Sequence, residues 1–394
     1  MKEVLKGIRV LDFTRVLAGP YATRILADAG AEVIKVQSGK TAHGVESNSE
    51  GYFNTWNRNK KSITLNMDFP EAGDLVLKLT ALSDVVVENF SPRVMLNWGL
   101  TFEKLREARV DLIMLSMSGM GRNGPWKDFV AYAPTIHSLS GMTYLSSETK
   151  DLPLGPGYAH ADMVAGLYGA LSVLAALEYR DRTGEGQYID LSELEAMCTA
   201  IGPALLEAFA NQINILPSCN RAPYRPAAPH GCYRCKGEER WCVIAVFNET
   251  EWRALCKVAG KEEWVEDPRY ATIAGRMEHA PELDQAIEGW TSKQDAEQLV
   301  NLLQEQGIAA GVVQNAQDLA GDPHLKARDF FVHLEHPVLG ETISDASPIK
   351  CKGSSREKWK SAPLLGADNG YVFLELLGLK EDELNAFIER GIIG

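Results

Sequence analysis

Short apolar runs alternate with helical patterns along the first half of the chain. The run GIRVLDF at residues 7–13 is rich in aliphatic residues and predicts a strand. A helix is predicted at residues 18–28, where Pro20 suits a first helical turn, and AEVIKV at residues 31–36 predicts the next strand. A strand, a helix and a strand in so short a span indicate parallel strands. Further strands are predicted at residues 62–65, 85–87, 112–117 and 187–191, and a further helix at residues 70–82.

This alternation predicts a doubly wound α/β domain with a parallel sheet. Sheets of this class bind their ligands at the carboxyl ends of the strands. One loop at that edge, residues 119–124, has the glycine spacing of a dinucleotide-binding fingerprint. The fingerprint requires a helix directly after the glycines, but Pro125 and Trp126 follow instead. We therefore expect no NAD site in this loop.

Proline content marks a change of domain in the second half. Residues 217–231 are rich in proline and predict a linker. After this linker, a hairpin, several helical patterns and a strand predict a smaller α+β domain at residues 232–329. A second polar, proline-containing segment at residues 353–366 precedes two short predicted helices, at residues 371–377 and 381–390.

An uncharged run at residues 163–177 predicts a helix, and we expect this helix to be buried core because the run is too short to span a bilayer. Four of its apolar residues share helical spacing: Val164, Leu167, Leu171 and Leu174. Asp162 stands directly before the run. It can cap the helix N-terminus, a common role for Asp, or act as a nucleophile held beside free backbone N–H groups. Spacing alone does not separate these two interpretations.

Net charge limits the classes of partner. The chain of 394 residues carries a formal charge of −13, which gives nucleic acid or an anionic membrane no electrostatic attraction. The N-terminus lacks the apolar segment of a signal peptide, and the seven scattered cysteines fit reduced thiols, so we expect a cytoplasmic protein. Cys232 and Cys235 form a single pair without a second pair at zinc-ligand spacing, so no metal site is predicted.

Six segments of the chain follow one another in a distinctive order: GIRVLDFTRVLAGPYATRILADAGAEVIKV, NRNKKSITLNM, VVVENFSP, LSMSGMGRNGP, the Asp162 segment with EYRDRTGEGQYIDLSELEAM, and DPHLKARDFF. Together they resemble the class III CoA-transferases, which include formyl-CoA:oxalate and carnitine CoA-transferases. The resemblance implies that residues 1–216 and 330–394 form one large CoA-binding domain. It also implies that two ring-like chains interlock, as a homodimer or as a heteromer with a homologous subunit.

The resemblance assigns the family nucleophile to Asp162. Such a carboxylate attacks the donor thioester and forms a mixed anhydride, and the released CoA thiolate returns to give an aspartyl-CoA thioester. The acid acceptor then reverses these steps. The family takes a CoA thioester as substrate and uses no prosthetic group. We expect succinyl-CoA as the donor and a larger dicarboxylic acid as the acceptor.

The resemblance also implies the CoA-binding positions, which are Val16, Ala18, Leu65, Asn89 and Phe90. From the residues alone, Val16, Leu65 and Phe90 are equally compatible with a place in the core.

Basic residues that some members use at the CoA phosphates or the substrate are missing here. Their positions hold Ser38, Asn97, Ser118 and Val130, and Gln37 stands where the family often has a Glu. The basic residues nearest in sequence to the expected cleft are then the candidates for binding the CoA phosphates. They are Arg93 and the group Arg58, Lys60 and Lys61. The missing cations also support the alternative that a sister chain completes the site.

An acyl-CoA racemase of the same superfamily is another alternative. Racemases pair a His with an Asp as acid and base, and the His position holds Tyr132 here. A tyrosine has too high an ordinary pKa for a simple replacement. His137 and His160 are near in sequence but not at that position. A third alternative, a non-catalytic scaffold subunit, disagrees with an intact Asp162.

Overall fold

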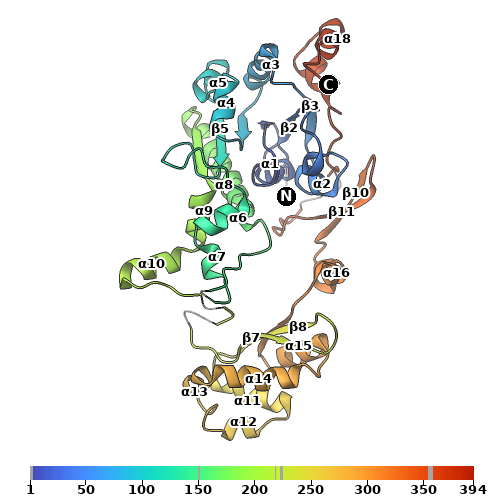
Figure 1. The fold of residues 1–394 in the computed structure, drawn as a ribbon. Helices are drawn as coiled ribbons and strands as arrows, with labels where there is room; N and C mark the ends of the chain where they lie inside the picture. The colour runs from blue at the N-terminus through green and yellow to red at the C-terminus, as the bar shows by residue number, and fades with distance from the viewer. Residues whose placement is uncertain (1–2, 150, 218, 222–224, 354–357) are drawn as a thin grey trace. The chain divides into compact units, whose positions relative to one another are not determined.

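The chain divides into two compact units in the computed structural model, which describes residues 3–149, 151–217, 219–221, 225–353 and 358–394 (Figure 1). Unit 1 comprises Met1–Thr143, Gly155–Ile213 and Lys326–Gly394, and unit 2 comprises Tyr144–Leu154 and Asn214–Leu325. The boundaries predicted from the sequence lie after residues 216 and 329. The sequence analysis did not predict that residues 144–154 belong to unit 2. Parts of both predicted linkers, residues 218, 222–224 and 354–357, lie outside the described residues.

Unit 1 is built on a six-stranded sheet in which every neighbouring pair is parallel. The order is β3-β2-β1-β4-β5-β6, so the chain reverses its direction across the sheet between β1 and β4. The predicted parallel α/β architecture is thereby confirmed. The strands are β1 (Arg9–Asp12), β2 (Glu32–Gln37), β3 (Lys61–Thr64), β4 (Val85–Glu88), β5 (Ile113–Ser118) and β6 (Tyr188–Ser192).

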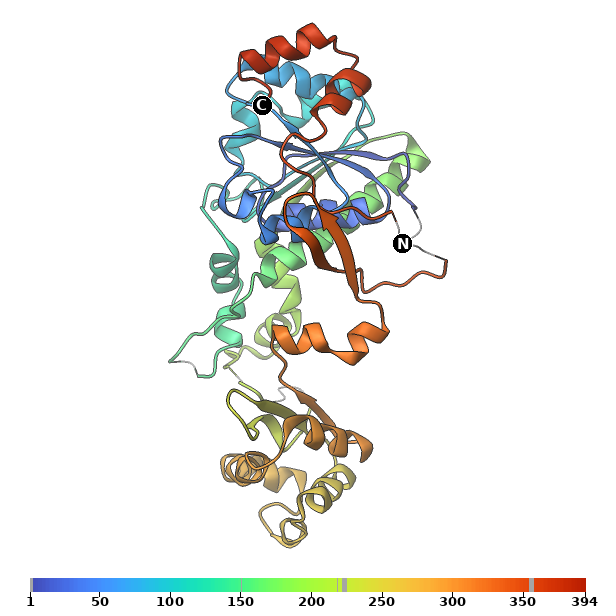
Figure 2. The same cartoon turned by 90° about the vertical axis from the view of Figure 1, so that its right-hand side faces the viewer.

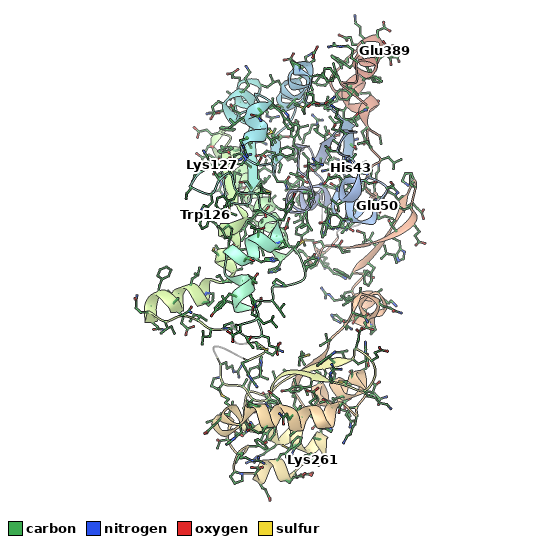
Figure 3. All side chains as sticks on the ribbon, viewed as in Figure 1. His43, Glu50, Trp126, Lys127, Lys261 and Glu389 are labelled. Atoms are coloured by element: carbon green, nitrogen blue, oxygen red, sulfur yellow. The ribbon has the colours of Figure 1, made fainter. Side chains whose placement is uncertain are left out.

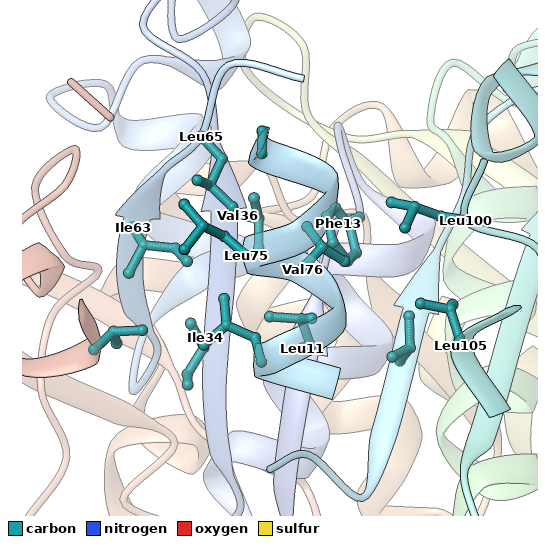
Figure 4. Close-up of a cluster of buried hydrophobic side chains, with 14 of the residues drawn as sticks. Leu11, Phe13, Ile34, Val36, Ile63, Leu65, Leu75, Val76, Leu100 and Leu105 are labelled. Carbon is teal, nitrogen blue, oxygen red and sulfur yellow. The ribbon is translucent and has the colours of Figure 1, made fainter. Parts of the chain in front are cut away.

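Both faces of this sheet are covered by helices (Figure 2). Successive residues of a strand point to opposite faces, so Leu11 and Ile34 pack with Leu75 of α3 on one side (Figure 4). Val10 and Val33 pack under α1 and α8 on the other side. The nearly continuous apolar character of these strands follows from this double burial.

The helices of unit 1 include short ones in segments for which no element was predicted. They are α1 (Ala18–Asp28), α2 (Gly51–Asn57), α3 (Pro70–Ala81), α4 (Arg93–Asn97), α5 (Phe102–Ala108), α6 (Ala133–Leu139), α8 (His160–Thr183), α9 (Glu193–Ala200), α10 (Gly202–Asn211) and α18 (Glu381–Glu389). A 3-10 turn at Gly44–Glu46 (η1) and a π-helix at Tyr371–Leu376 (η2) complete the unit, and α7 (Met142–Leu145) lies at its boundary.

Helix α8 is longer than predicted and buries a different face. It ends at Gly184, whose φ of 76° provides the left-handed cap common at helix C-termini. Its buried residues include Ala165, Gly166, Gly169, Ala170 and Val173. The leucines that revealed the helix are exposed instead, with Leu167 at 52% and Leu171 at 61%. The prediction of an apolar helix was right, but the prediction that its leucine stripe is core was wrong for this chain.

Length and composition alone would let α8 cross a membrane. One face of α8, however, packs against α1 and the sheet. The core helix of a folded domain meets the same two criteria, so they carry little weight here.

The C-terminal segment returns to unit 1 and closes the β3 edge of its sheet. Side chains of Asp368 and Asn369 accept the N–H groups of Ser62 and Thr64 at 2.8 and 3.0 Å. The backbone N–H of Asn66 donates to the carbonyl of Ile392 at 2.8 Å. Unpaired strand edges invite association, and this edge is covered by the chain itself.

A hairpin of β10 (Phe331–His336) and β11 (Gly340–Asp345) precedes this return. It was not predicted, although residues 332–335 (VHLE) alternate between apolar and polar.

Unit 2 holds a three-stranded antiparallel sheet, β7-β8-β9, covered by helices. The predicted hairpin corresponds to β7 and β8. The elements are β7 (His230–Arg234), β8 (Trp241–Ala245), β9 (Ala309–Val312), α11 (Glu249–Ala259), α12 (Glu263–Glu266), α13 (Ile273–Glu278), α14 (Ala280–Thr291), α15 (Ala296–Glu305) and α16 (Ala316–Gly321), while α17 (Pro323–Ala327) reaches the boundary.

Two basic residues expected near CoA are part of the core of unit 1. Lys60 and Asp12 are both fully buried, with Nζ 3.0 Å from the carboxylate. Burial alone would raise the pKa of Asp12, but Lys60, Lys35 and two hydroxyls bring it below its usual value. Arg58 is buried against Asp28 at 2.6 Å. The prediction that Arg58 and Lys60 bind phosphate is therefore wrong, because both cations are already neutralised inside the protein.

Replacement of Lys60 by Ala should destabilise the fold strongly, because it leaves the buried Asp12 without its main partner. We expect a loss of about 3–5 kcal/mol in the free energy of unfolding, measured by urea denaturation. The control is Lys61→Ala, where Nζ is partly exposed and 3.9 Å from Glu32, so the loss should stay below about 1 kcal/mol. Equal losses in both variants would contradict a structural role specific to Lys60.

Candidate active site

Asp162 lies in the first turn of α8 and faces the N-terminus of α1. Partial burial raises the pKa of its carboxyl, and hydrogen bonds from the backbone N–H groups of Ala18 and of Asp162 itself oppose that rise. The N-cap of α8 is Ala159, without a side-chain hydrogen bond. Asp162 is therefore not the N-cap residue of α8: it is the third residue of the helix, and the backbone N–H groups of Ala18 and of Asp162 itself both act on its carboxyl.

Glycine allows the two helices to come this close. A Cβ on Gly166 would lie 2.9 Å from the Ala18 carbonyl oxygen and 2.8 Å from the Tyr21 ring. A Cβ on Gly169 would lie 3.0 Å from the sulfur of Met117 on β5. Side chains at these positions would push α8 away from α1 and the sheet. The glycines thus set the distance between Asp162 and the Ala18 N–H.

His137 of α6 holds the start of α8. The backbone N–H of Ala161 donates to Nε2 of His137 at 3.0 Å, which assigns the ring proton to Nδ1. Burial lowers the pKa of His137, and the nearby His160 adds to the effect, so the ring is neutral at neutral pH. His137 therefore positions the helix that carries Asp162.

The loop before α1 is strained and tied down. Val16 has a φ of 64°, which is rare for a β-branched residue. Its N–H donates to a carboxylate oxygen of Glu46 at 2.5 Å. The Asn89 amide accepts the N–H of Arg15 at 2.7 Å and donates to the Arg15 carbonyl at 2.9 Å. Strain of this kind persists only where the surroundings hold it, and it is concentrated at functional sites.

A cleft of about 280 Å³ opens beside this loop, at the carboxyl ends of β1 to β3. Of the predicted CoA-binding residues, Leu65 and Phe90 line it. Val16, Ala18 and Asn89 do not line it. Val16 lies in the loop before α1 and contacts Glu46, and Ala18 begins α1 and faces Asp162. Asn89 holds the loop through Arg15. Their predicted contact with CoA stays a prediction.

The cleft contains cations other than those expected. Lys40 lines it with an exposed side chain, 2.5 Å from Asp68. Arg15 also lines it, partly exposed, and donates to the Thr41 carbonyl at 3.3 Å. Lys35 is buried and donates to the Thr14 carbonyl at 2.6 Å. Arg15 and Lys40 are therefore the cations that a ligand in the cleft would meet.

Arg93 lies outside the lining of the cleft, and its predicted contact with CoA stays a prediction. Its side chain is 69% exposed, and its Nε is 3.6 Å from Asp128. Trp126 and Lys127, in the segment after the glycines, lie at the surface of unit 1 (Figure 3). The next helix, α6, begins only at Ala133.

Two groups whose pKa is affected by the charge of Asp162 were not predicted from the sequence. Burial, with Asp162 as the next cause, raises the pKa of Tyr52 to about 12, so its hydroxyl keeps its proton. Burial and Asp162 also raise the pKa of Glu193 to about 8. The available signal for Glu193 was its place directly after a predicted strand, at the ligand-binding edge of the sheet.

The racemase alternative finds little support in this geometry. Tyr132, at the position of the racemase His, is exposed at the N-cap of α6. His137 uses Nε2 to accept the Ala161 N–H.

Comparisons with known proteins place these observations in a family. The model of CoA-transferase family III matches residues 5–369. Succinyl-CoA–D-citramalate CoA-transferase of Chloroflexus aurantiacus is 33% identical over 99% of this chain and 98% of its own. The succinyl-CoA–L-malate CoA-transferase beta subunit of the same organism is 29% identical over 99% of this chain and 98% of its own. A CAIB/BAIF family protein from Brucella suis superposes with a TM-score of 0.87 at 28% identity, over 95% of this chain and 100% of that one. The chain belongs to CoA-transferase family III and is an enzyme of that family.

Proposed function

We propose that this enzyme moves CoA from an acyl-CoA donor to a carboxylic acid through covalent intermediates on Asp162. The observation that carries the proposal is the carboxylate of Asp162 in the first turn of α8, facing the Ala18 N–H. A carboxylate with a raised pKa is more basic, and therefore a better nucleophile once ionised.

The steps follow from the chemistry of a carboxylate. An oxygen of Asp162 bonds to the thioester carbonyl carbon, and the carbon–sulfur bond breaks to give a mixed anhydride and CoA thiolate. The thiolate attacks the Asp162 carbonyl and releases the donor acid, which leaves an aspartyl-CoA thioester. The acceptor carboxylate repeats both steps in reverse. The bound thiolate stays at high effective concentration throughout.

Backbone N–H groups serve the oxyanions of these steps. In the resting site the Ala18 N–H donates to the charged carboxylate. Once Asp162 is acylated its charge is gone, so the same donor can hold the negative oxygen of a tetrahedral intermediate. A backbone donor fixed by the start of α1 needs no reorganisation for this second role.

The cleft at the ends of β1 to β3 fits the nucleotide end of CoA. Leu65 and Phe90 supply apolar surface for the adenine, and Arg15 and Lys40 supply charge for the phosphates. This local charge matters because the whole chain has a net charge of −13 and repels an anionic ligand at long range.

We propose succinyl-CoA as the donor and a dicarboxylic acid as the acceptor. Two relatives that align with almost the whole chain are named for transfer between succinyl-CoA and D-citramalate or L-malate. Both of these acceptors are hydroxy dicarboxylic acids. A panel of D-citramalate, L-malate, glutarate and oxalate, each assayed with succinyl-CoA, separates the acceptors.

We also propose that the working form is an interlocked dimer. The exposed leucines of α8 support it: Leu167, Leu171 and Leu174 would be costly to leave in water along one helix. One relative is named as a beta subunit, so the second chain is either a copy or a homologous subunit.

Replacement of Asp162 by Asn should abolish transfer, because the amide cannot form the anhydride. We expect kcat to fall by at least about a hundredfold while the circular dichroism spectrum stays unchanged. Wild-type enzyme mixed with succinyl-CoA and then hydroxylamine should carry an adduct at Asp162 by mass spectrometry. Asp181→Asn, near the other end of α8, is the matched control and should keep its activity. Substantial turnover by Asp162→Asn would refute the nucleophile.

Replacement of Lys40 by Ala should weaken binding of the donor. We expect KM for succinyl-CoA to rise about three- to tenfold with little change in kcat, because the lost contact is the same in ground and transition states. Arg93→Ala is the comparison, since Arg93 lies outside the cleft lining. If KM for succinyl-CoA rises only in Arg93→Ala, Lys40 does not bind the donor and the prediction that Arg93 meets the CoA phosphates is supported.

Replacement of Leu171 by Glu should break the dimer, because the charge would be buried at the subunit contact. Light scattering should give wild-type enzyme a mass twice that of the 43.3 kDa chain, and the variant a smaller mass. Leu302→Glu, which changes another exposed leucine on α15, is the control and should leave the mass unchanged. A stable wild-type monomer at micromolar concentration would argue against the proposed dimer.

A further inference from the structure

Glu193 is a buried carboxyl on α9, a helix that packs against α8, which carries Asp162. It is the first residue of α9, follows the N-cap Ser192, and is only 9% exposed. Helix α9 packs against α6, α8 and β6. The first turn of α9 rests on the glycine loop, where the Leu194 N–H donates to the Gly119 carbonyl at 3.0 Å. Among the described residues, no hydrogen bond or ion pair to the Glu193 carboxyl is found.

The charged and titratable groups around α9 differ in their effect on Glu193. They are His137 on α6, Asp162 and His160 on α8, Asp190 on β6, Arg122 in the glycine loop, and Glu195 and Cys198 on α9 itself. His137 is neutral and accepts the Ala161 N–H. Asp190 accepts the Arg122 N–H at 3.0 Å, and the Arg122 side chain pairs with Glu88. Of these groups, only Asp162 acts appreciably on Glu193.

Two carboxyls that share a site of low polarity do not both ionise readily. The difference between them decides which one carries the charge. The backbone N–H groups of Ala18 and of Asp162 itself lower the pKa of the Asp162 carboxyl and so oppose the effect of its burial. Glu193 is more deeply buried and, in the described structure, has no such donor. The negative charge therefore rests on Asp162, and the proton on Glu193.

We propose that Glu193 is the proton-bearing partner of Asp162, that it keeps the site at a single negative charge, and that its ionisation stops transfer. The proposal rests on Asp162 being the nucleophile. Glu193 acts through Asp162 and is a positioning residue, because nothing places it against the reacting atoms. Its ionisation would add a second negative charge near Asp162, and this charge would repel an anionic acid and oppose the developing oxyanions.

The pH dependence has a definite sign. Burial, with the charge of Asp162 as a second cause, raises the pKa of Glu193 to about 8, so its carboxyl is neutral below that pH and charged above it. We expect kcat/KM to fall on the alkaline side, by about tenfold per pH unit for loss of one proton. Glu193→Gln keeps a neutral side chain of the same shape, so its activity should persist into the alkaline range. Glu195→Gln, an exposed neighbour on α9, should keep the wild-type profile.

Thermal stability provides a readout that does not depend on activity. A carboxyl whose pKa is raised by folding stabilises the fold below its unfolded value near 4.5, and this stability is lost as pH rises towards about 8. The melting temperature of Glu193→Gln minus that of wild type should therefore increase with pH across this window. The same difference for Glu195→Gln should stay flat. Glu193→Met, also neutral, should behave like Glu193→Gln.

Each outcome decides the proposal. An increasing difference in melting temperature together with loss of the alkaline limb in Glu193→Gln supports it. A flat difference, or an alkaline limb unchanged in Glu193→Gln, overturns it. Failure of both neutral variants to fold at pH 7 also overturns it, because the site must then need a charged Glu193. If Asp162→Asn keeps its activity, the proposed nucleophile fails, whereas the melting series still tests the protonation of Glu193.

Discussion

The close packing of α8 on α1 is the contact on which the site depends. Two glycines on α8 replace side chains that would meet the Ala18 carbonyl, Tyr21 and Met117. A larger separation would open the packing of Ala18 and Ala22 against Ala165 and Ala170, and it would also move the Ala18 N–H away from the Asp162 carboxylate. The small residues of α8 therefore serve both the core and the site, and the larger residues of the helix lie on its other face.

The sheet order of unit 1 is that of dinucleotide-binding proteins, yet the helix after β1 has another use. In those proteins the N-terminus of this helix binds the phosphates of the ligand. Here the first N–H of the helix, that of Ala18, faces the Asp162 carboxylate of the same chain. The cleft lies to one side, at the carboxyl ends of β1 to β3. The fold keeps an anion at the helix N-terminus but supplies that anion from α8.

Sequence periodicity predicted the strands and helices of the sheet because each has a strong apolar pattern. It could not predict which face of α8 is buried in this chain. Leucines at helical spacing indicate an apolar face, but they do not indicate whether that face packs within the domain or against another subunit. Arg58 and Lys60 were misplaced for a related reason. They directly precede β3 and so lie at its amino end, where Arg58 pairs with Asp28 and Lys60 pairs with Asp12. Glu193 and Tyr52 were missed because their character comes from burial beside Asp162, a contact between segments far apart in the chain.

The closure of the β3 edge by the C-terminal segment has a consequence for synthesis. Ser62, Thr64 and Asn66 find their hydrogen-bond partners among residues 368–394, which leave the ribosome after unit 2 and after the rest of unit 1. Until then the sheet of unit 1 is a nascent structure with an open edge and with part of its core missing, including Val372, Phe373 and Ile392. Nearly all of unit 2 emerges before that segment. Unit 1 is therefore begun before unit 2 and completed after it, and a chain truncated before residue 368 would expose the β3 edge of the sheet.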